Sequence, residues 1–287
     1  MIDLSWLFHL ASLFPLDGMD MRFMQQALVA LVLLAPMTAA LGVQVVCYRM
    51  AFFSDAVGHS AFAGVAIGLV LGVNPHISMP LFGLAVGLII MFMQRFSALP
   101  SDTVIGVVFS AVVAAGLAVV SRNNTIARDL QQFLYGDILT MTETDILWLL
   151  ALFAVFVLFQ IVAFNRLLYA STSGIIARAH RVPVALFEYL FAALLALVVM
   201  FSVWGVGVLL VTAMLIVPAA SARNFARSAG GMFWWAILVS LSSAVTGLAL
   251  SVQPWMGTAT GATIILVSCA WFVASVVVSS VRNERQA

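Results

Sequence analysis

Charged residues divide this chain into long uncharged stretches. Residues other than Asp, Glu, Lys and Arg run without interruption over 23–48, 56–94, 103–121, 146–165, 189–222 and 228–281. About 20 apolar residues cross the hydrocarbon core of a bilayer as a helix, which satisfies its own backbone hydrogen bonds there. The pattern therefore predicts an all-α, polytopic integral membrane protein.

Three of these stretches are too long for one helix, and each contains residues that break helices. Asn74-Pro75-His76 and Gln253-Pro254-Trp255 split two of them. Trp204-Gly205-Val206-Gly207 divides the third into a broken or short helix pair. We expect about eight or nine transmembrane helices. The predicted segments lie near 24–47, 55–73, 77–94, 103–121, 145–165, 186–203, 206–222, 232–252 and 260–281.

Composition supports a membrane protein and excludes several other classes. Of the 287 residues, 64% are hydrophobic and 8% are charged, against roughly 25% charged in a soluble domain. So few charges could not cover a water-soluble enzyme. The net charge of +1 gives no sign of nucleic-acid binding.

The distribution of arginine predicts the orientation in the membrane. If the loop after the first span is cytoplasmic, nine arginines lie on the cytoplasmic side and three on the other, so the C-terminus is predicted to be cytoplasmic. The longest cytoplasmic loop is then 166–185. Residues 1–20 include an apolar stretch too short to span, which predicts an interfacial helix on the outer face. No linker separates domains, so residues 1–287 are expected to form one transmembrane domain.

Asp55 and His59 are the outstanding candidates for chemistry, because ionisable groups inside a membrane segment are costly. Spaced i and i+4, they share one helix face, where a carboxylate oxygen and an imidazole nitrogen can converge on Zn²⁺, Mn²⁺ or Fe²⁺. A structural alternative is open: Ser54 could be an N-cap, Asp55 a first-turn acid and His59 a hydrogen-bonded core histidine. Two ligands are too few for a closed site, and a symmetric dimer would supply four.

Other features favour packing over chemistry. The chain contains no lysine, so it lacks the P-loop lysine that nucleotide hydrolysis needs. HExxH and GxSxG motifs are also missing from the sequence, and Cys47 and Cys269 form no CxxC pair. The chain is therefore not expected to be an enzyme. His76, in a short outer loop, is a weaker metal candidate. A close-packing role is expected for the glycines at positions 58, 64, 68 and 72.

Four ordered sequence blocks together resemble one family, the membrane permeases of ABC importers for zinc, manganese or iron. Residues 49–61 (RMAFFSDAVGHSA) look like the family's D-x-x-x-H segment after the first span. Residues 133–139 (FLYGDIL) resemble its extracytoplasmic F-L-x-G-x-I-L block. Residues 206–220 (VGVLLVTAMLIVPAA) are close to its late half-helix, and 261–265 (GATII) to the start of its last span.

The resemblance implies a type II ABC importer-like permease in the bacterial cytoplasmic (inner) membrane. It would work as a dimer with a second copy or a paralogue, with two cytoplasmic ATP-binding subunits and an extracytoplasmic metal-binding protein. The family's pair lines the translocation path, which carries over onto Asp55 and His59. No cofactor would be bound permanently, and the metal is cargo. Zinc and manganese both accept these ligand types.

The resemblance also assigns a coupling element to the cytoplasmic loop 166–185. The family's segment that docks on the ATPase reads A-R-A-x-G-x-P. Ala177, Arg178, Ala179 and Pro183 match it, and Arg181 stands where the family has glycine.

Two other functions remain open at this point. A secondary, proton-coupled transporter or channel could use Asp55 and His59 as a relay without any ATPase. A non-transporting membrane scaffold subunit would not need either side chain, although the loop 166–185 would still matter.

Overall fold

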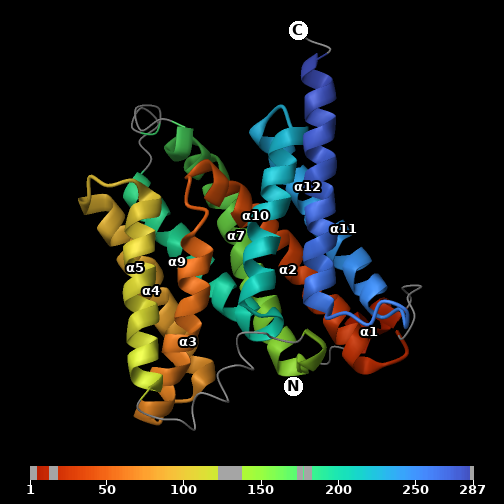
Figure 1. The fold of residues 1–287 in the computed structure, drawn as a ribbon, viewed down its shortest axis with the longest axis horizontal. Helices are drawn as coiled ribbons and strands as arrows, with labels where there is room; N and C mark the ends of the chain where they lie inside the picture. Colours follow the sequence, from red (N-terminus) through yellow and green to blue (C-terminus); the bar gives the residue numbers. More distant parts are fainter. Residues whose placement is uncertain (1–4, 13–18, 122–137, 173–176, 178–182, 285–287) are drawn as a thin grey trace. The chain divides into compact units, whose positions relative to one another are not determined.

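The computed structural model describes residues 5–12, 19–121, 138–172, 177 and 183–284, and the regular structure in these ranges is helical, with no strand. Nine of the described helices, all except α1 and the single turn η1, are long and apolar enough to cross a membrane, which confirms the predicted fold class. The elements are α1 (Ser5–Ser12), α2 (Arg22–Cys47), α3 (Phe53–Leu71), α4 (Pro75–Phe96), α5 (Ser101–Val120), η1 (Ile138–Thr140), α7 (Glu143–Thr172), α9 (Val184–Val206), α10 (Val208–Phe225), α11 (Ala229–Ser251) and α12 (Thr260–Glu284) (Figure 1).

Two of the predicted helix breaks contain a proline within a long uncharged run. Asn74 is the N-cap of α4, and its side-chain oxygen accepts a hydrogen bond from the backbone N–H of His76 at 2.9 Å. Pro75 occupies the first helical position, where a missing N–H has no consequence. Both predicted splits, at residues 74–76 and 253–255, are therefore confirmed.

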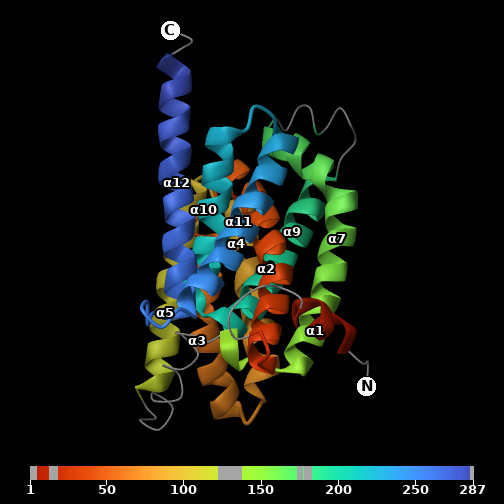
Figure 2. The same cartoon turned by 90° about the vertical axis from the view of Figure 1, so that its right-hand side faces the viewer.

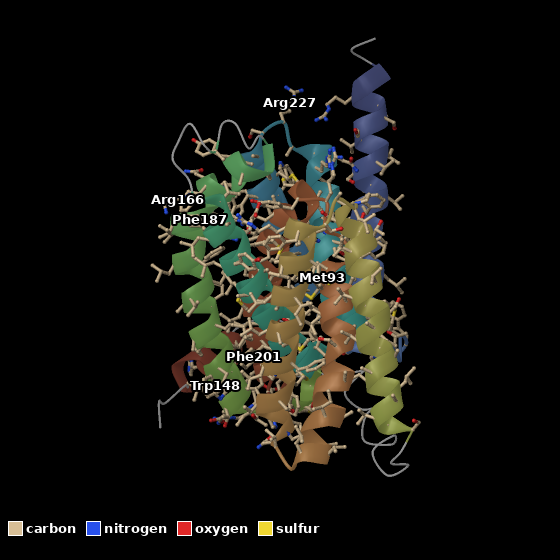
Figure 3. All side chains as sticks on the ribbon, turned by 90° about the vertical axis from the view of Figure 1, so that its left-hand side faces the viewer. Met93, Trp148, Arg166, Phe187, Phe201 and Arg227 are labelled. Carbon is tan, nitrogen blue, oxygen red and sulfur yellow. The ribbon has the colours of Figure 1, made fainter. Side chains whose placement is uncertain are left out.

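The end predicted for the fifth span is wrong by seven residues. Residues 145–165 were expected to form this helix, because Arg166 ends the uncharged run, but α7 continues to Thr172. A charge ends the apolar stretch and not the helix, since arginine is itself a good helix former. The Arg166 guanidinium lies over the ring of Phe187 in α9, 4.9 Å from its centroid. Figure 3 labels both side chains.

The break predicted at residues 204–207 lies at Gly207, between α9 and α10. With 23 residues α9 is long enough to cross a bilayer, so the short member of the pair is α10, with 18 residues. Gly207 has φ 78° and ψ 161°, a conformation that is open to glycine and strained for any residue with a Cβ. The chain can therefore end one helix and begin the next with a single residue between them.

Replacing Gly207 with alanine should destabilise the protein by about 2 kcal/mol, because alanine would be forced into this conformation. The measurement is the melting temperature of the purified protein in detergent. Gly230→Ala is the matched control, since Gly230 lies in helix α11 with nothing within 4 Å of an added Cβ. Equal melting temperatures for the two variants would contradict the strained geometry.

The chain forms two compact units, and three helices contribute residues to both. One unit contains Met1–Val43, Asp137–Val155 and Ala213–Ala287, and the other contains Gln44–Gly136 and Phe156–Thr212. Helices α2, α7 and α10 each begin in one unit and end in the other. The expectation of one transmembrane domain over 1–287 stays a prediction.

In the unit that contains α3, this helix packs against α4, α5 and α9 (Figure 1). A Cβ added at Gly64 would lie 3.2 Å from the Met79 backbone, and one at Gly68 would lie 2.1 Å from the Ser78 hydroxyl. The predicted packing role is thus confirmed for these glycines. It is wrong for Gly72, which has nothing within 4 Å and ends α3 as a left-handed C-cap with φ 69°.

In the other unit, α11 packs on α12, as Figure 2 shows. A Cβ at Gly247 of α11 would lie 2.6 Å from the Cα of Ile264 in α12, so the two helices approach closely. Near the other end of α12, the Arg282 guanidinium donates hydrogen bonds to the carbonyl oxygens of Asn224 and Phe225. These carbonyl groups belong to the last two residues of α10, and a cation is favourable at the C-terminus of a helix because of the helix dipole.

Candidate metal-binding site

Asp55 and His59 lie one turn apart on α3, as their spacing predicts. The helix begins at Phe53, so Asp55 is in its first turn and His59 in its second. Both side chains are half-buried. A regular helix through both positions places them on one face, where their Cβ atoms are about 5–6 Å apart. This Asp55–His59 pair is the candidate metal site.

The structural alternative for this segment is partly wrong. Ser54 is not an N-cap, since the N-cap position of α3 is Phe52 and no side chain caps it. The Ser54 side chain is fully buried, and its Oγ has no hydrogen-bond partner among the described residues. Asp55 does occupy the first turn, where a carboxylate is favourable to the helix dipole. That location is compatible with either role of Asp55.

Thr212 of α10 contacts Asp55 directly. The Thr212 Oγ1 donates a hydrogen bond to Oδ1 of Asp55 over 2.8 Å, from a position 157 residues away in the sequence. An ionised carboxylate only accepts hydrogen bonds, so the hydroxyl is the donor. One carboxylate oxygen is therefore occupied and Oδ2 remains for another partner. Sequence reasoning missed Thr212, and the only signal was a single hydroxyl within the apolar residues 206–218.

His59 lies beside an aromatic ring of α5. Its imidazole centroid is 5.4 Å from that of Phe109, with the rings tilted by 53°. Among the described residues, no side chain is hydrogen-bonded to the His59 imidazole. The alternative of a hydrogen-bonded core histidine therefore has no support within the described part of the chain. A neutral imidazole nitrogen keeps a lone pair that can bind a metal ion.

The described part of one chain supplies the pair and no larger cluster. No group of three or more His, Cys, Asp and Glu side chains that could hold a metal occurs among the described residues. One carboxylate and one imidazole match the oxygen and nitrogen ligands that zinc and manganese accept. Two ligands from each copy remain consistent with a site that a second copy would complete.

Three further ionisable side chains, those of His76, Glu188 and His9, belong to helices other than α3. His76 is exposed near the start of α4, and its ring packs on Trp204 of α9 with centroids 3.7 Å apart. Glu188 is half-buried in the second turn of α9, and His9 is exposed on α1. His76 thus contacts the helix that ends just before Gly207.

The predicted coupling residues are only partly within the described structure. Ala177 is fully buried, and Pro183 is the exposed N-cap residue of α9. Arg178, Ala179 and Arg181 lie outside the described residues. Their role in coupling stays a prediction.

A tyrosine tethers the helices on either side of the predicted coupling loop. The Tyr48 hydroxyl donates a hydrogen bond to the Leu167 carbonyl of α7 at 3.2 Å, and its ring stacks on Phe191 of α9. Burial raises the pKa of the Tyr48 hydroxyl well above its ordinary value, so the side chain stays a neutral donor. Tyr48 thus contacts both α7 and α9.

Comparisons with known proteins agree with the fold and with the sequence blocks. The family model described as the ABC 3 transport family matches residues 20–279. The chain is 33% identical over 250 residues to the high-affinity zinc uptake system membrane protein ZnuB of Haemophilus influenzae, covering 87% of this chain and 95% of ZnuB. It is 32% identical over 257 residues to the manganese import system permease protein ScaB of Streptococcus gordonii, covering 89% and 91%.

Solved structures show the same architecture. The structure of PsaBC from Streptococcus pneumoniae in complex with Fab matches with a TM-score of 0.77 and 30% identity, covering 90% of this chain and 93% of that one. A metal-chelate type ABC transporter in an inward-facing conformation matches in fold, with a TM-score of 0.67 and 18% identity over 95% and 96%. The chain therefore belongs to the ABC 3 transport family, and it is a membrane permease subunit rather than an enzyme.

Proposed function

We propose that this chain is the permease of an ATP-driven importer that carries zinc or manganese through a dimeric pathway lined by Asp55 and His59. The observation that carries the proposal is the Asp55–His59 pair itself, two metal-ligating side chains one turn apart on a membrane helix. Charged and ionisable groups in such a helix are expensive and are commonly functional. The names of ZnuB and ScaB support a metal cargo.

The energy source would be a separate subunit. This chain has no lysine and therefore no P-loop of its own. The ABC 3 family description supports separate ATP-binding partners. These subunits would contact the loop 166–185 from the cytoplasm, with Ala177, Arg178, Ala179, Arg181 and Pro183 as the coupling residues. An extracytoplasmic metal-binding protein would deliver the ion to the outer face, and the C-terminus would be cytoplasmic.

The pair suits an ion that must enter and leave. A complete tetrahedral shell of protein ligands holds zinc as a structural ion, whereas fewer protein ligands leave positions open. One Asp and one His per copy would bind the ion in a site shared by two copies. Reversal of access on ATP binding would then expose the site to the cytoplasm. Transport needs binding that is sufficient for entry but weak enough for release.

Metal uptake tests this proposal. The chain is expressed with a candidate ATP-binding subunit and binding protein from the same organism, in a host that lacks its own zinc and manganese importers. We expect accumulation of one of the two metals, and the metal restored identifies the cargo. Accumulation should stop when the P-loop lysine of the partner ATPase is substituted, because ATP hydrolysis drives the cycle.

Two results would overturn the proposal in different ways. Uptake that persists with the inactive ATPase would identify a secondary transporter or channel. An assembled complex that restores neither metal would favour a non-transporting scaffold. Membrane levels of every subunit are measured in parallel, so that poor expression is distinguished from loss of transport.

A further inference from the structure

We propose that Thr212 is a positioning residue that orients the Asp55 carboxylate for the metal ion, an inference that rests on the proposed function. Thr212 would not ligate the metal itself. It would hold Oδ1 of Asp55 through its 2.8 Å hydrogen bond and so leave Oδ2 for the cargo. Such partners of a ligating side chain fix its orientation and contribute to metal affinity.

The direction of the Thr212 hydrogen bond distinguishes it from other hydroxyls in the membrane helices. Serine and threonine in such helices often donate to a carbonyl one turn earlier in their own helix. Thr38 donates to Leu34, Ser221 to Val217 and Thr246 to Ser242 in this way. Because a hydroxyl has one proton, Thr212 cannot donate both to Asp55 and to its own helix. Its hydroxyl therefore donates its hydrogen bond to the neighbouring helix α3.

The packing of α3 against α10 fixes the register that brings these two residues together. A Cβ added at Gly58 would lie 3.1 Å from Cγ1 of Val208, so glycine allows α10 to approach α3 closely at this point. Val208 and Thr212 are four residues apart on α10, and Asp55 and Gly58 are three apart on α3. Each pair occupies one face of its helix. The two contacts lie one turn apart, and their order makes the helices antiparallel there.

The residue that precedes α10 fixes where this helix starts. Gly207, in the conformation described above, sets where the helix begins, and Thr212 follows in the second turn. The side chains of Val208, Leu210 and Val211, which precede Thr212 on α10, are buried. Thr212 is therefore presented from a packed helix rather than from a loop, which gives its hydroxyl a defined position.

Metal binding to the purified permease–ATPase complex, without the binding protein, tests the inference. The dissociation constants of zinc and manganese are measured by competition with a metal-chelating dye. We expect Thr212→Val, which keeps the shape but removes the donor, to weaken binding of the transported metal about tenfold or more. Thr212→Ser keeps the donor and should restore the wild-type constant. Thr246→Val removes a hydroxyl bonded to its own helix and should leave binding unchanged.

A double substitution separates positioning from a general effect on the fold. If Thr212 acts only through Asp55, Thr212→Val should not weaken binding further in an Asp55→Ala background. Additive losses would overturn the inference, as would wild-type affinity in Thr212→Val. Should Asp55→Ala itself bind the metal as tightly as wild type, the proposed metal site fails rather than this refinement. Melting temperatures of all variants show whether each one is folded.

Discussion

Asp55→Ala should reduce metal uptake at least about a hundredfold, because it removes an anionic ligand from the path. Loss of a residue that only supports a metal ligand already lowers metal affinity or activity by about 10–100-fold. The effect is expected to be this large because Asp55 is half-buried in a membrane helix and carries the negative charge of the pair. The measurement is the initial rate of zinc or manganese accumulation, normalised to the amount of permease in the membrane. Asp55→Asn should behave similarly, because the amide keeps the shape and loses the charge.

Asp102→Ala is the matched control for the structural role of a first-turn acid. Asp102 occupies the first turn of α5, as Asp55 does in α3, but its side chain is exposed. If the helix dipole were the only reason for Asp55, both substitutions would cost about 0.3–1 kcal/mol in stability and neither would stop uptake. We expect uptake to be near normal in Asp102→Ala. Equal uptake in the two variants would reject Asp55 as a metal ligand.

His59→Ala should act in the same direction as Asp55→Ala. Loss of the imidazole nitrogen removes the second ligand of the same copy, and a dimer would lose two. His76→Ala is the comparison, because the His76 ring packs on Trp204 and neither residue belongs to the pair. Uptake that is lost in His76→Ala but retained in His59→Ala would move the metal site to the start of α4.

Gly42→Ala should cause a large loss of stability. A Cβ at Gly42 of α2 would lie 1.8 Å from the backbone carbonyl oxygen of Leu215 in α10. A backbone atom cannot move aside as a flexible side chain does, so the two helices must separate. We expect a loss of about 3 kcal/mol, measured as a lower melting temperature and a reduced amount in the membrane.

The control for Gly42→Ala is Gly106→Ala. Gly106 is on α5, and an added Cβ there would have nothing within 4 Å. Alanine favours a helix over glycine, so this variant should be as stable as wild type or slightly more stable. Similar melting temperatures for the two variants would contradict the close approach of α2 and α10 at Gly42.

The helices were predictable from sequence because charged side chains and unpaired backbone polar groups are costly in the hydrocarbon core of a bilayer. Long uncharged runs, divided at three helix breaks, located the nine helices of the described residues that are long and apolar enough to cross a membrane, and proline with asparagine located the break before α4. The errors have local causes. Arg166 ended the predicted span but not α7, since arginine is a good helix former. Gly72 was assigned to packing but caps α3, because spacing along a helix does not reveal where the helix ends.

The candidate metal site was likewise predictable in part from the sequence, and the rest of it depends on the tertiary structure. Asp55 and His59 are four residues apart, so helical geometry alone placed them on one face. Thr212 is 157 residues from Asp55, and no local pattern relates the two. Their contact depends on the register of α3 against α10, which the missing side chain of Gly58 permits.

The sequence by itself determined that this chain spans a membrane with about eight or nine helices, that it lacks its own nucleotide-hydrolysing lysine, and that Asp55 and His59 share a helix face. These properties follow from composition and from spacing within single helices. Only the tertiary structure decided which hydroxyl is hydrogen-bonded to Asp55, that Ser54 does not cap α3, and which glycines allow close helix contact. The physical reason is that apolar membrane helices resemble one another in sequence, whereas their packing depends on side-chain shape at a few positions distant along the chain.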